Sequence, residues 1–221
     1  VNKLSFKRTV AKGILFSIGL SILFLFLYCA LSKTVRREED LKSVLSITYL
    51  GNIPFIKVKK RSDASKSRIL LDSQNNGDML SESVRIVRNR ITKETDEQEK
   101  AQILITSAEE GEGKTTVSVN LAISMALKGK KVILVDGDLR NPSVTHALGL
   151  PEADFGTVDV LAGQKLTEQH ILTYGEPPLY VLPGRKSTPA EQNVLQQERI
   201  EGMLATLRET YDCIIVDTPP C

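Results

Sequence analysis

The sequence predicts an α/β domain whose mostly parallel sheet is covered by helices on both faces, preceded by one transmembrane helix. Short apolar runs rich in β-branched residues, at 103–107, 131–135 and 213–216, are typical of buried parallel strands. Amphipathic helical patterns lie between these runs, as expected when helices connect parallel strands. Near the N-terminus, residues 13–32 carry no charge and are long enough to cross a bilayer.

From residue 79 the predicted order is helix, strand, helix, strand, a connector with short helices, strand, helix, strand. The first helix carries an apolar stripe at helical spacing, which indicates that it packs on the sheet. The last helix is predicted to begin near residue 188, because Thr188 suits an N-cap and Pro189 suits the first helical position.

A glycine-rich loop follows the first strand. Gly111 and Gly113 allow a tight turn whose backbone N–H groups face phosphate oxygens. Lys114 supplies a positive charge for the phosphates, and the Thr115 hydroxyl suits a Mg²⁺ ion. The segment departs from the strict motif at Ala108, where the general pattern has glycine. The residues predicted to contact ATP are Gly111, Glu112, Gly113, Lys114, Thr115 and Thr116.

The other two strands end in aspartates. Asp136 and Asp138 follow the second strand, and Asp217 closes the third. Ligands of open α/β sheets bind beyond the carboxyl ends of the strands, so we expect these acids beside the glycine-rich loop. A single aspartate in such a place is commonly a helix cap or a turn former. Three strands that end in compatible chemistry instead predict a nucleotide site with Mg²⁺, whose metal ligands are Thr115, Asp138 and Asp217.

These motifs together resemble a known family. The GEGKT loop, the run ILVDGDLRNP at 133–142 and the DTPP run at 217–220 are similar to the Walker A, A′ and B motifs of the bacterial tyrosine kinases. The resemblance extends over nearly the whole chain and implies a P-loop NTPase-like fold. It also implies an ATP- and Mg²⁺-dependent protein-tyrosine autokinase that regulates capsule or exopolysaccharide polymerisation and export.

The resemblance assigns roles to the site residues. Lys114 holds the phosphates and stabilises charge on the transferred group, Asp138 holds the metal, and Asp136 orients or deprotonates the acceptor tyrosine. The predicted catalytic residues are therefore Lys114, Asp136 and Asp138. Related MinD/ParA-type ATPases carry a signature lysine where this chain has Glu109, which favours the kinase branch.

Glu82, Arg85 and Arg88 form an ExxRxxR pattern, and the three side chains are expected on one helix face. From the residues alone, a solvated face with a Glu82–Arg85 pair and a contact between subunits are equally supported. The resemblance implies the contact, which closes a ring of identical chains so that one subunit's tyrosine-bearing tail reaches its neighbour's active site.

The apolar stretch sets the expected domain order. An extracytoplasmic flank at 1–12 precedes the transmembrane helix at 13–32, a cytoplasmic juxtamembrane linker follows at 33–78, and a kinase domain occupies 79–221. Basic residues flank both ends of the helix, so the orientation is argued from the ATP site, which belongs in the cytosol of a bacterial cell. A cleaved signal peptide is the alternative, and it would export a nucleotide site away from ATP.

Composition and charge limit the classes of molecule that this protein is expected to bind. The chain has 221 residues and a formal charge of +2 without basic and aromatic interleaving, which argues against nucleic acid. The linker's basic residues (Lys57, Lys59, Lys60, Arg61) lie either on anionic lipid or in a solvated loop. The transmembrane segment implies membrane lipid as a partner. The resemblance implies further copies of the chain, polysaccharide polymerase and export machinery, and a cognate tyrosine phosphatase as partners.

Two other functions stay open at this point. One is a membrane-tethered nucleotide-binding scaffold for polysaccharide assembly without tyrosine transfer, and the other is a plain P-loop ATPase. The chain stops four residues after Asp217, so the domain is expected to be truncated at its C-terminus, before further strands and before any tyrosine-rich tail.

Overall fold

The computed structural model describes residues 3–31, 47–55, 70–71, 79–95, 100–188, 191 and 196–221. The chain divides into two compact units, Val1–Tyr49 and Leu50–Cys221. Most of the predicted linker, including its basic residues at 57–61, lies outside the described residues.

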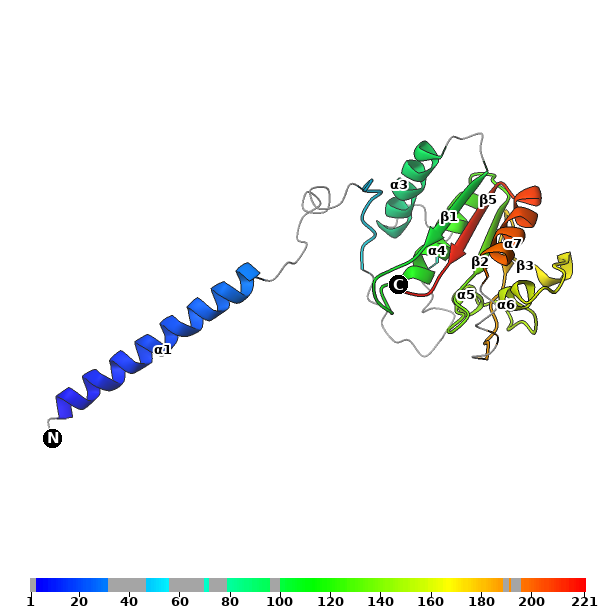
Figure 1. The fold of residues 1–221 in the computed structure, drawn as a ribbon. Coiled ribbons are helices and arrows are strands. Elements are labelled where there is room, and N and C mark those ends of the chain that lie inside the picture. The colour runs from blue at the N-terminus through cyan, green and yellow to red at the C-terminus, as the bar shows by residue number, and fades with distance from the viewer. Residues whose placement is uncertain are drawn as a thin grey trace. The chain divides into compact units, whose positions relative to one another are not determined.

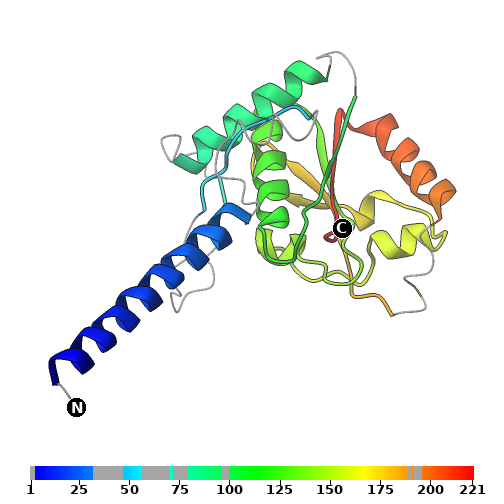
Figure 2. The same cartoon turned by 60° about the vertical axis from the view of Figure 1, so that its left-hand side comes forward.

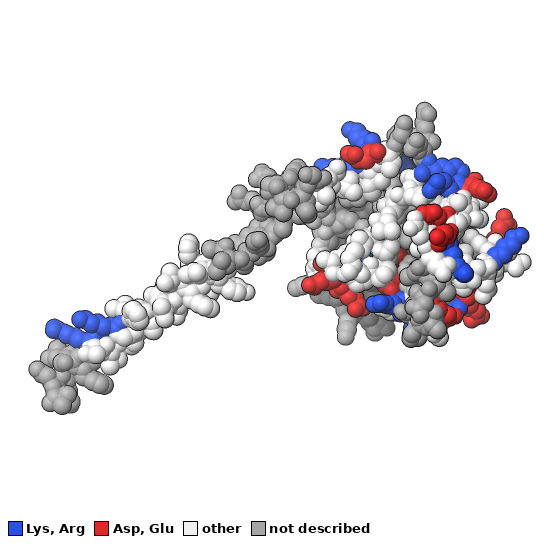
Figure 3. All heavy atoms as spheres, in the orientation of Figure 1, with Lys and Arg blue, Asp and Glu red and all other residues white. Residues whose placement is uncertain are grey.

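The first unit contains one long helix, α1 (Lys3–Leu31). Its candidate membrane span is Arg8–Cys29, in which every described side chain is exposed. Twenty-two residues at about 1.5 Å each reach roughly 33 Å, the thickness of a bilayer core. Figure 3 shows that this helix is uncharged over most of its described length, with Lys and Arg near one end. By length and composition, α1 is able to cross a membrane.

The second unit is built on a five-stranded sheet (Figure 1). The spatial order is β1-β5-β2-β4-β3, and every neighbouring pair is parallel except β3 with β4. This confirms the mostly parallel sheet. The strands are β1 (Ala101–Ile105), β2 (Val132–Asp136), β3 (Leu172–Tyr174), β4 (Leu179–Leu182) and β5 (Cys213–Asp217).

Helices cover both faces of the sheet, as Figure 2 shows. On one face, α4 (Lys114–Ala126) packs against β2, α3 (Met79–Glu94) packs against α4, and both belong to the core that contains Val132 and Leu134. On the other, α7 (Gln197–Thr210) and α6 (Thr157–Leu161) pack against Ile133 and Val135. Alternate residues of β2 therefore pack into the cores on the two faces of the sheet. A shift of the strand by one residue would move each side chain to the opposite face. Two short elements complete the domain: α5 (Val144–Leu148) and a 3₁₀ turn, η2 (Glu168–His170).

The strands β1, β5 and β2 end level with one another. Ile105 pairs with Asp217, and Asp217 pairs with Asp136. The parallel register brings the glycine-rich loop after β1 and the two aspartates to the same edge of the sheet. The edge strand β1 pairs only with β5 among the described strands, and Leu104, its fourth residue, is 65% exposed.

Two details of the predicted elements are wrong. The connector ends in a hairpin, β3 and β4, where the sequence predicted one strand, because β3 has only three residues and no alternating pattern to reveal it. The last helix begins at Gln197 and not near Thr188. The cap signal itself is real but local: the Thr188 amide and hydroxyl donate to Glu191 Oε2 at 2.7 and 2.9 Å, nine residues before α7 starts.

Candidate nucleotide-binding site

The glycine-rich loop connects β1 to the N-terminus of α4. Gly111 and Gly113 have φ of 82° and 91°, the left-handed region in which a side chain is strained. Gly113 is the N-cap of α4 and provides no side-chain cap. The amide groups from Gly111 to Thr115 find no hydrogen-bond acceptor among the described residues. These donors, at the positive end of a helix dipole, are suited to the oxygens of an anion.

Asp217 lies directly behind the first turn of α4 and is 1% exposed. The Thr115 hydroxyl donates to Asp217 Oδ2 at 2.6 Å, and the Ser118 hydroxyl donates to Asp217 Oδ1 at 2.8 Å. Burial raises the pKa of Asp217, while these two hydrogen bonds and the positive charge of Lys114 act in the opposite direction. The Walker B-like strand and the phosphate loop are therefore joined through side chains.

Asp136 is completely buried at the end of β2. Its Oδ2 accepts from the amides of Ser143 and Val144, both at 3.0 Å, and its Oδ1 accepts from the Asp138 amide at 3.3 Å. Burial raises the pKa of Asp136 to about 7. The nearby negative charge of Asp217 also raises this pKa, whereas the three amide hydrogen bonds lower it. A carboxyl group with that pKa changes protonation near neutral pH, as a general base requires.

Gly137 allows the close approach of Asp136 and Asp217. Its amide donates to the Asp217 carbonyl at 2.7 Å, one step beyond the β2–β5 ladder. A Cβ at this position would lie 2.8 Å from the same carbonyl oxygen, so any side chain would push the two strand ends apart. Glycine between the two acids of the DGD run is thus required by packing.

Asp138 is partly exposed in the turn that follows. Its Oδ1 accepts from the amides of Arg140 at 3.2 Å and Asn141 at 2.9 Å. Its charge contributes to the raised pKa of Asp217, which places both carboxylates within electrostatic reach of each other. The Arg140 side chain is exposed, and the described residues form no ion pair with it.

The predicted metal ligands fit Mg²⁺ only in combination with a nucleotide. Among the described residues, no group of three His, Cys, Asp or Glu side chains could hold a metal ion. A hydroxyl and two carboxylates lie near the carboxyl ends of the parallel strands, supplied by Thr115, Asp138 and Asp217. Mg²⁺ prefers oxygen ligands of this kind. In phosphate-transfer sites Mg²⁺ takes one or two carboxylates, with phosphates and water completing the shell. The residues present fit that pattern.

Two serines of this cluster were not predicted. Ser118 follows Thr115 by three positions, so both hydroxyls lie on the same side of α4, a spacing that was visible in the sequence. Ser143 lies with its hydroxyl 2.9 Å from the Thr115 hydroxyl, and its amide donates to Asp136. No local pattern marks Ser143, because the turn after β2 brings it back to the site.

A second charged cluster fixes the segment that follows β4. Arg185 donates to both Asp159 oxygens, at 2.7 and 2.6 Å, and to Glu191 Oε1 at 2.7 Å. Hydrogen bonding to Arg185 lowers the pKa of Asp159, and it lowers the pKa of Glu191 to about 2.

Replacement of Arg185 by methionine should therefore change how stability depends on acid. Both acids have folded pKa values below their ordinary 3.8 and 4.5, so their stabilisation is present above those values and is lost as the pH falls towards about 2. We expect the free energy of unfolding to fall less steeply with acid in Arg185→Met, measured by urea denaturation across this pH range. Arg199→Met, which removes a hydrogen bond to the Leu161 carbonyl, is the control. An unchanged slope in Arg185→Met would contradict the assignment.

The ExxRxxR residues do not share one exposed face, and that part of the prediction is wrong. Glu82 and Arg85 are exposed and form an ion pair at 2.6 Å. Arg88 is 7% exposed and donates to the hydroxyl and carbonyl of Ser124 in α4, at 2.8 and 3.1 Å. The i, i+6 spacing turns Arg88 far enough around α3 to join the buried side.

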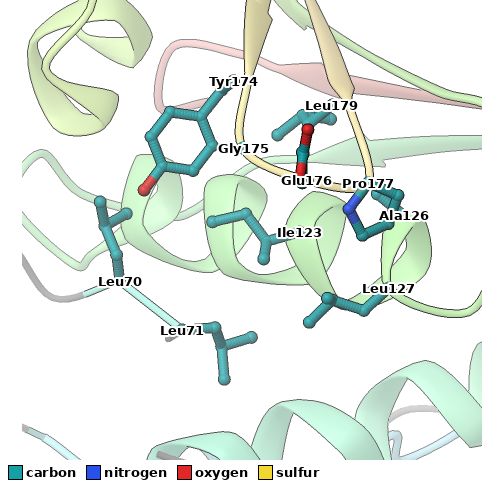
Figure 4. Close-up of a pocket in the computed structure, with 10 residues that line it drawn as sticks. All are labelled: Leu70, Leu71, Ile123, Ala126, Leu127, Tyr174, Gly175, Glu176, Pro177 and Leu179. Carbon is teal, nitrogen blue, oxygen red and sulfur yellow. The ribbon is translucent and has the colours of Figure 1, made fainter. Parts of the chain in front are cut away.

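A half-open pocket of about 290 Å³, lined mostly by apolar residues, lies elsewhere on the domain (Figure 4). It is lined by Leu70 and Leu71, the C-terminal end of α4 and the β3–β4 turn, and no residue of the phosphate loop lines it. The Leu71 amide donates to Asn120 Oδ1 at 2.7 Å, which fastens this segment to α4. The pocket is therefore separate from the nucleotide site.

Comparison with known proteins identifies the family. Residues 100–221, more than half of the chain, match the family described as AAA domain. The chain belongs to this AAA domain family. It is 36% identical over 140 residues to Tyrosine-protein kinase YwqD of Bacillus subtilis (strain 168), and 36% identical over 118 residues to Tyrosine-protein kinase CpsD of Streptococcus pneumoniae serotype 4.

The fold of this AAA domain agrees with these relatives. The kinase domain of the Escherichia coli tyrosine kinase ETK superposes with a TM-score of 0.72 at 28% identity, over 85% of this chain and 74% of that chain. The match to YwqD covers 63% of this chain and 59% of that protein, and the match to CpsD covers 53% and 52%. The chain thus spans little more than half the length of the curated kinases, and the predicted similarity to bacterial tyrosine kinases is confirmed.

Proposed function

We propose that this protein is a membrane-anchored, ATP-dependent protein-tyrosine kinase that acts in capsule or exopolysaccharide assembly. The proposal is carried by one observation: three features meet at the carboxyl ends of the parallel strands. They are loop amides without an acceptor among the described residues, the Thr115–Asp217 hydrogen bond and the buried Asp136. Phosphoryl transfer depends mainly on positioning and on electrostatic stabilisation, and these groups provide both. The similarity to the curated kinases supports tyrosine as the acceptor.

The residues take distinct roles in this proposal. The loop amides and Lys114 hold the β- and γ-phosphates and oppose the charge that develops during transfer. Thr115, Asp138 and Asp217 would hold Mg²⁺, which would supply positive charge to offset the charge of the phosphates. Asp136, with its pKa of about 7, accepts the proton of the tyrosine hydroxyl.

The proposal extends to location and partners. We infer that α1 anchors the chain in the bacterial cell membrane with the AAA domain in the cytoplasm, where ATP is present. Self-association through α3 would use the exposed Glu82 and Arg85, since Arg88 is engaged inside the domain. Membrane lipid, the polysaccharide polymerase and export machinery and a cognate phosphatase are the further partners.

The test is phosphotyrosine formation by the full chain in detergent micelles with ATP and Mg²⁺, with a random Glu/Tyr copolymer as acceptor. We expect phosphotyrosine with the unmodified chain and its loss in Lys114→Met, which removes the phosphate-binding charge. Nucleotide binding without phosphotyrosine would overturn the kinase in favour of the scaffold. Release of inorganic phosphate without phosphotyrosine would instead identify a plain ATPase.

A further inference from the structure

The phosphate loop carries an internal hydrogen-bonding arrangement that its nucleotide-binding pattern does not explain. Glu112 Oε2 accepts from the amide of Ala108 at 3.0 Å and from the amide of Glu109 at 3.1 Å. In the same stretch the Ser107 hydroxyl donates to the Glu109 carbonyl at 2.7 Å. One side chain thus closes the loop back onto its own beginning.

The loop amides therefore divide into two groups. Those of Ala108 and Glu109 are taken by Glu112, while those from Gly111 to Thr115 have no acceptor in the described part of the chain. The amide of Glu112 belongs to the second group, and its carboxylate accepts the hydrogen bonds of the first group. The side chain consequently fixes the start of the loop without occupying the donors that face phosphate.

The hydrogen bonds to Glu112 offset part of the conformational entropy that the glycine-rich loop loses when it becomes ordered. Gly111 and Gly113 give it the required left-handed turns, but glycine loses more conformational freedom on ordering than any other residue. An ionised acceptor makes stronger hydrogen bonds than a neutral one, and here it holds two donors at once. A loop that is already ordered loses less conformational entropy when it binds a ligand, so its affinity is higher.

Charge alone predicts the opposite role. Glu109, Glu110 and Glu112 place three acids around a site for an anion, and each should repel phosphate. Glu112 is the one of the three whose side chain forms hydrogen bonds with loop amides in the structure. Its effect on affinity therefore separates bracing from repulsion.

We propose that Glu112 is a positioning residue that pre-orders the phosphate loop for the nucleotide. The proposal rests on the nucleotide site of the proposed function but not on tyrosine transfer. It makes Glu112→Ala weaken nucleotide binding although that change removes a repulsive charge. Glu110→Ala is the matched control, because it removes the same charge from the same loop without removing a brace.

The experiment measures binding of a fluorescent ATP analogue with Mg²⁺ to the full chain in detergent micelles. We expect Glu112→Ala to bind about ten-fold more weakly, Glu112→Gln to recover most of the affinity through its amide oxygen, and Glu110→Ala to bind no more weakly than the unmodified chain. Equal affinities for Glu112→Ala and Glu110→Ala would overturn the proposal.

A second readout needs no nucleotide. Hydrogen–deuterium exchange on the peptide that covers the loop should become faster in Glu112→Ala and stay unchanged in Glu110→Ala, because only the first frees two amides. Unchanged exchange in Glu112→Ala would overturn the brace even if the kinase proposal stands. Binding of nucleotide without phosphotyrosine would overturn the kinase and leave the brace supported.

Discussion

Asp136→Asn should abolish tyrosine phosphorylation while MgATP still binds. The asparagine oxygen can take the place of Oδ2 and keep both 3.0 Å bonds from Ser143 and Val144, so only the longer bond from the Asp138 amide is lost. The turn and the proposed metal ligands Asp138 and Asp217 therefore keep their places. An amide cannot accept the tyrosine proton, and loss of a general base costs about 10²–10⁴-fold in rate.

Phosphotyrosine formation and nucleotide affinity are measured on the same preparation. We expect transfer to fall by at least about 100-fold and affinity for MgATP to change by less than about three-fold, since the base acts in the transition state and not in binding. Asp138→Asn is the comparison, because removal of this proposed metal ligand should weaken Mg²⁺-dependent nucleotide binding itself. Undiminished transfer in Asp136→Asn would rule out Asp136 as the base.

Arg88→Ala should destabilise the AAA domain, whereas Arg85→Ala should not. Arg88 makes two hydrogen bonds to Ser124 from a buried position, and a hydrogen bond to a charged group contributes about 1.5–3 kcal/mol. Its loss also leaves the Ser124 hydroxyl without this partner and opens space between α3 and α4. We expect a loss of about 2–4 kcal/mol in the free energy of unfolding.

Arg85→Ala is the matched control on the same helix. Its pair with Glu82 is exposed, and such pairs contribute about 0.2–1 kcal/mol. Denaturant unfolding measures both variants, and cross-linking of the full chain measures self-association. A stable Arg88→Ala that no longer self-associates would show that Arg88 serves the subunit contact and not the fold.

The strands that form the site could be predicted because they are short, apolar and β-branched, and because the glycine-rich loop follows β1 while β2 and β5 end in aspartates. Their register then follows from the parallel sheet, which brings Asp136 and Asp217 level. The same reasoning could not find β3, since three residues of a hairpin carry no period of their own.

Residues whose role depends on a distant partner were also missed. The ExxRxxR spacing predicts Arg88 on one helix face with Glu82 and Arg85, and only the packing of α4 reveals its buried partner Ser124. Ser143 belongs to the site through a turn that returns to Thr115. The Thr188 cap was recognised, but capping chemistry is local and closes a single turn as readily as it starts a long helix.

The exposed edge strand β1 has a consequence for symmetry. Among the described strands the outer edge of β1 has no partner, and the backbone groups of such an edge are a template for a further strand, from the same chain or from another copy. Two copies joined antiparallel through β1 would be related by a two-fold axis, and such a contact closes at a dimer. A ring through α3 is instead a head-to-tail contact, in which each copy presents a different surface to each neighbour. A dimer with two-fold symmetry would therefore favour pairing at the sheet edge, whereas a larger ring with cyclic symmetry would favour the contact through α3.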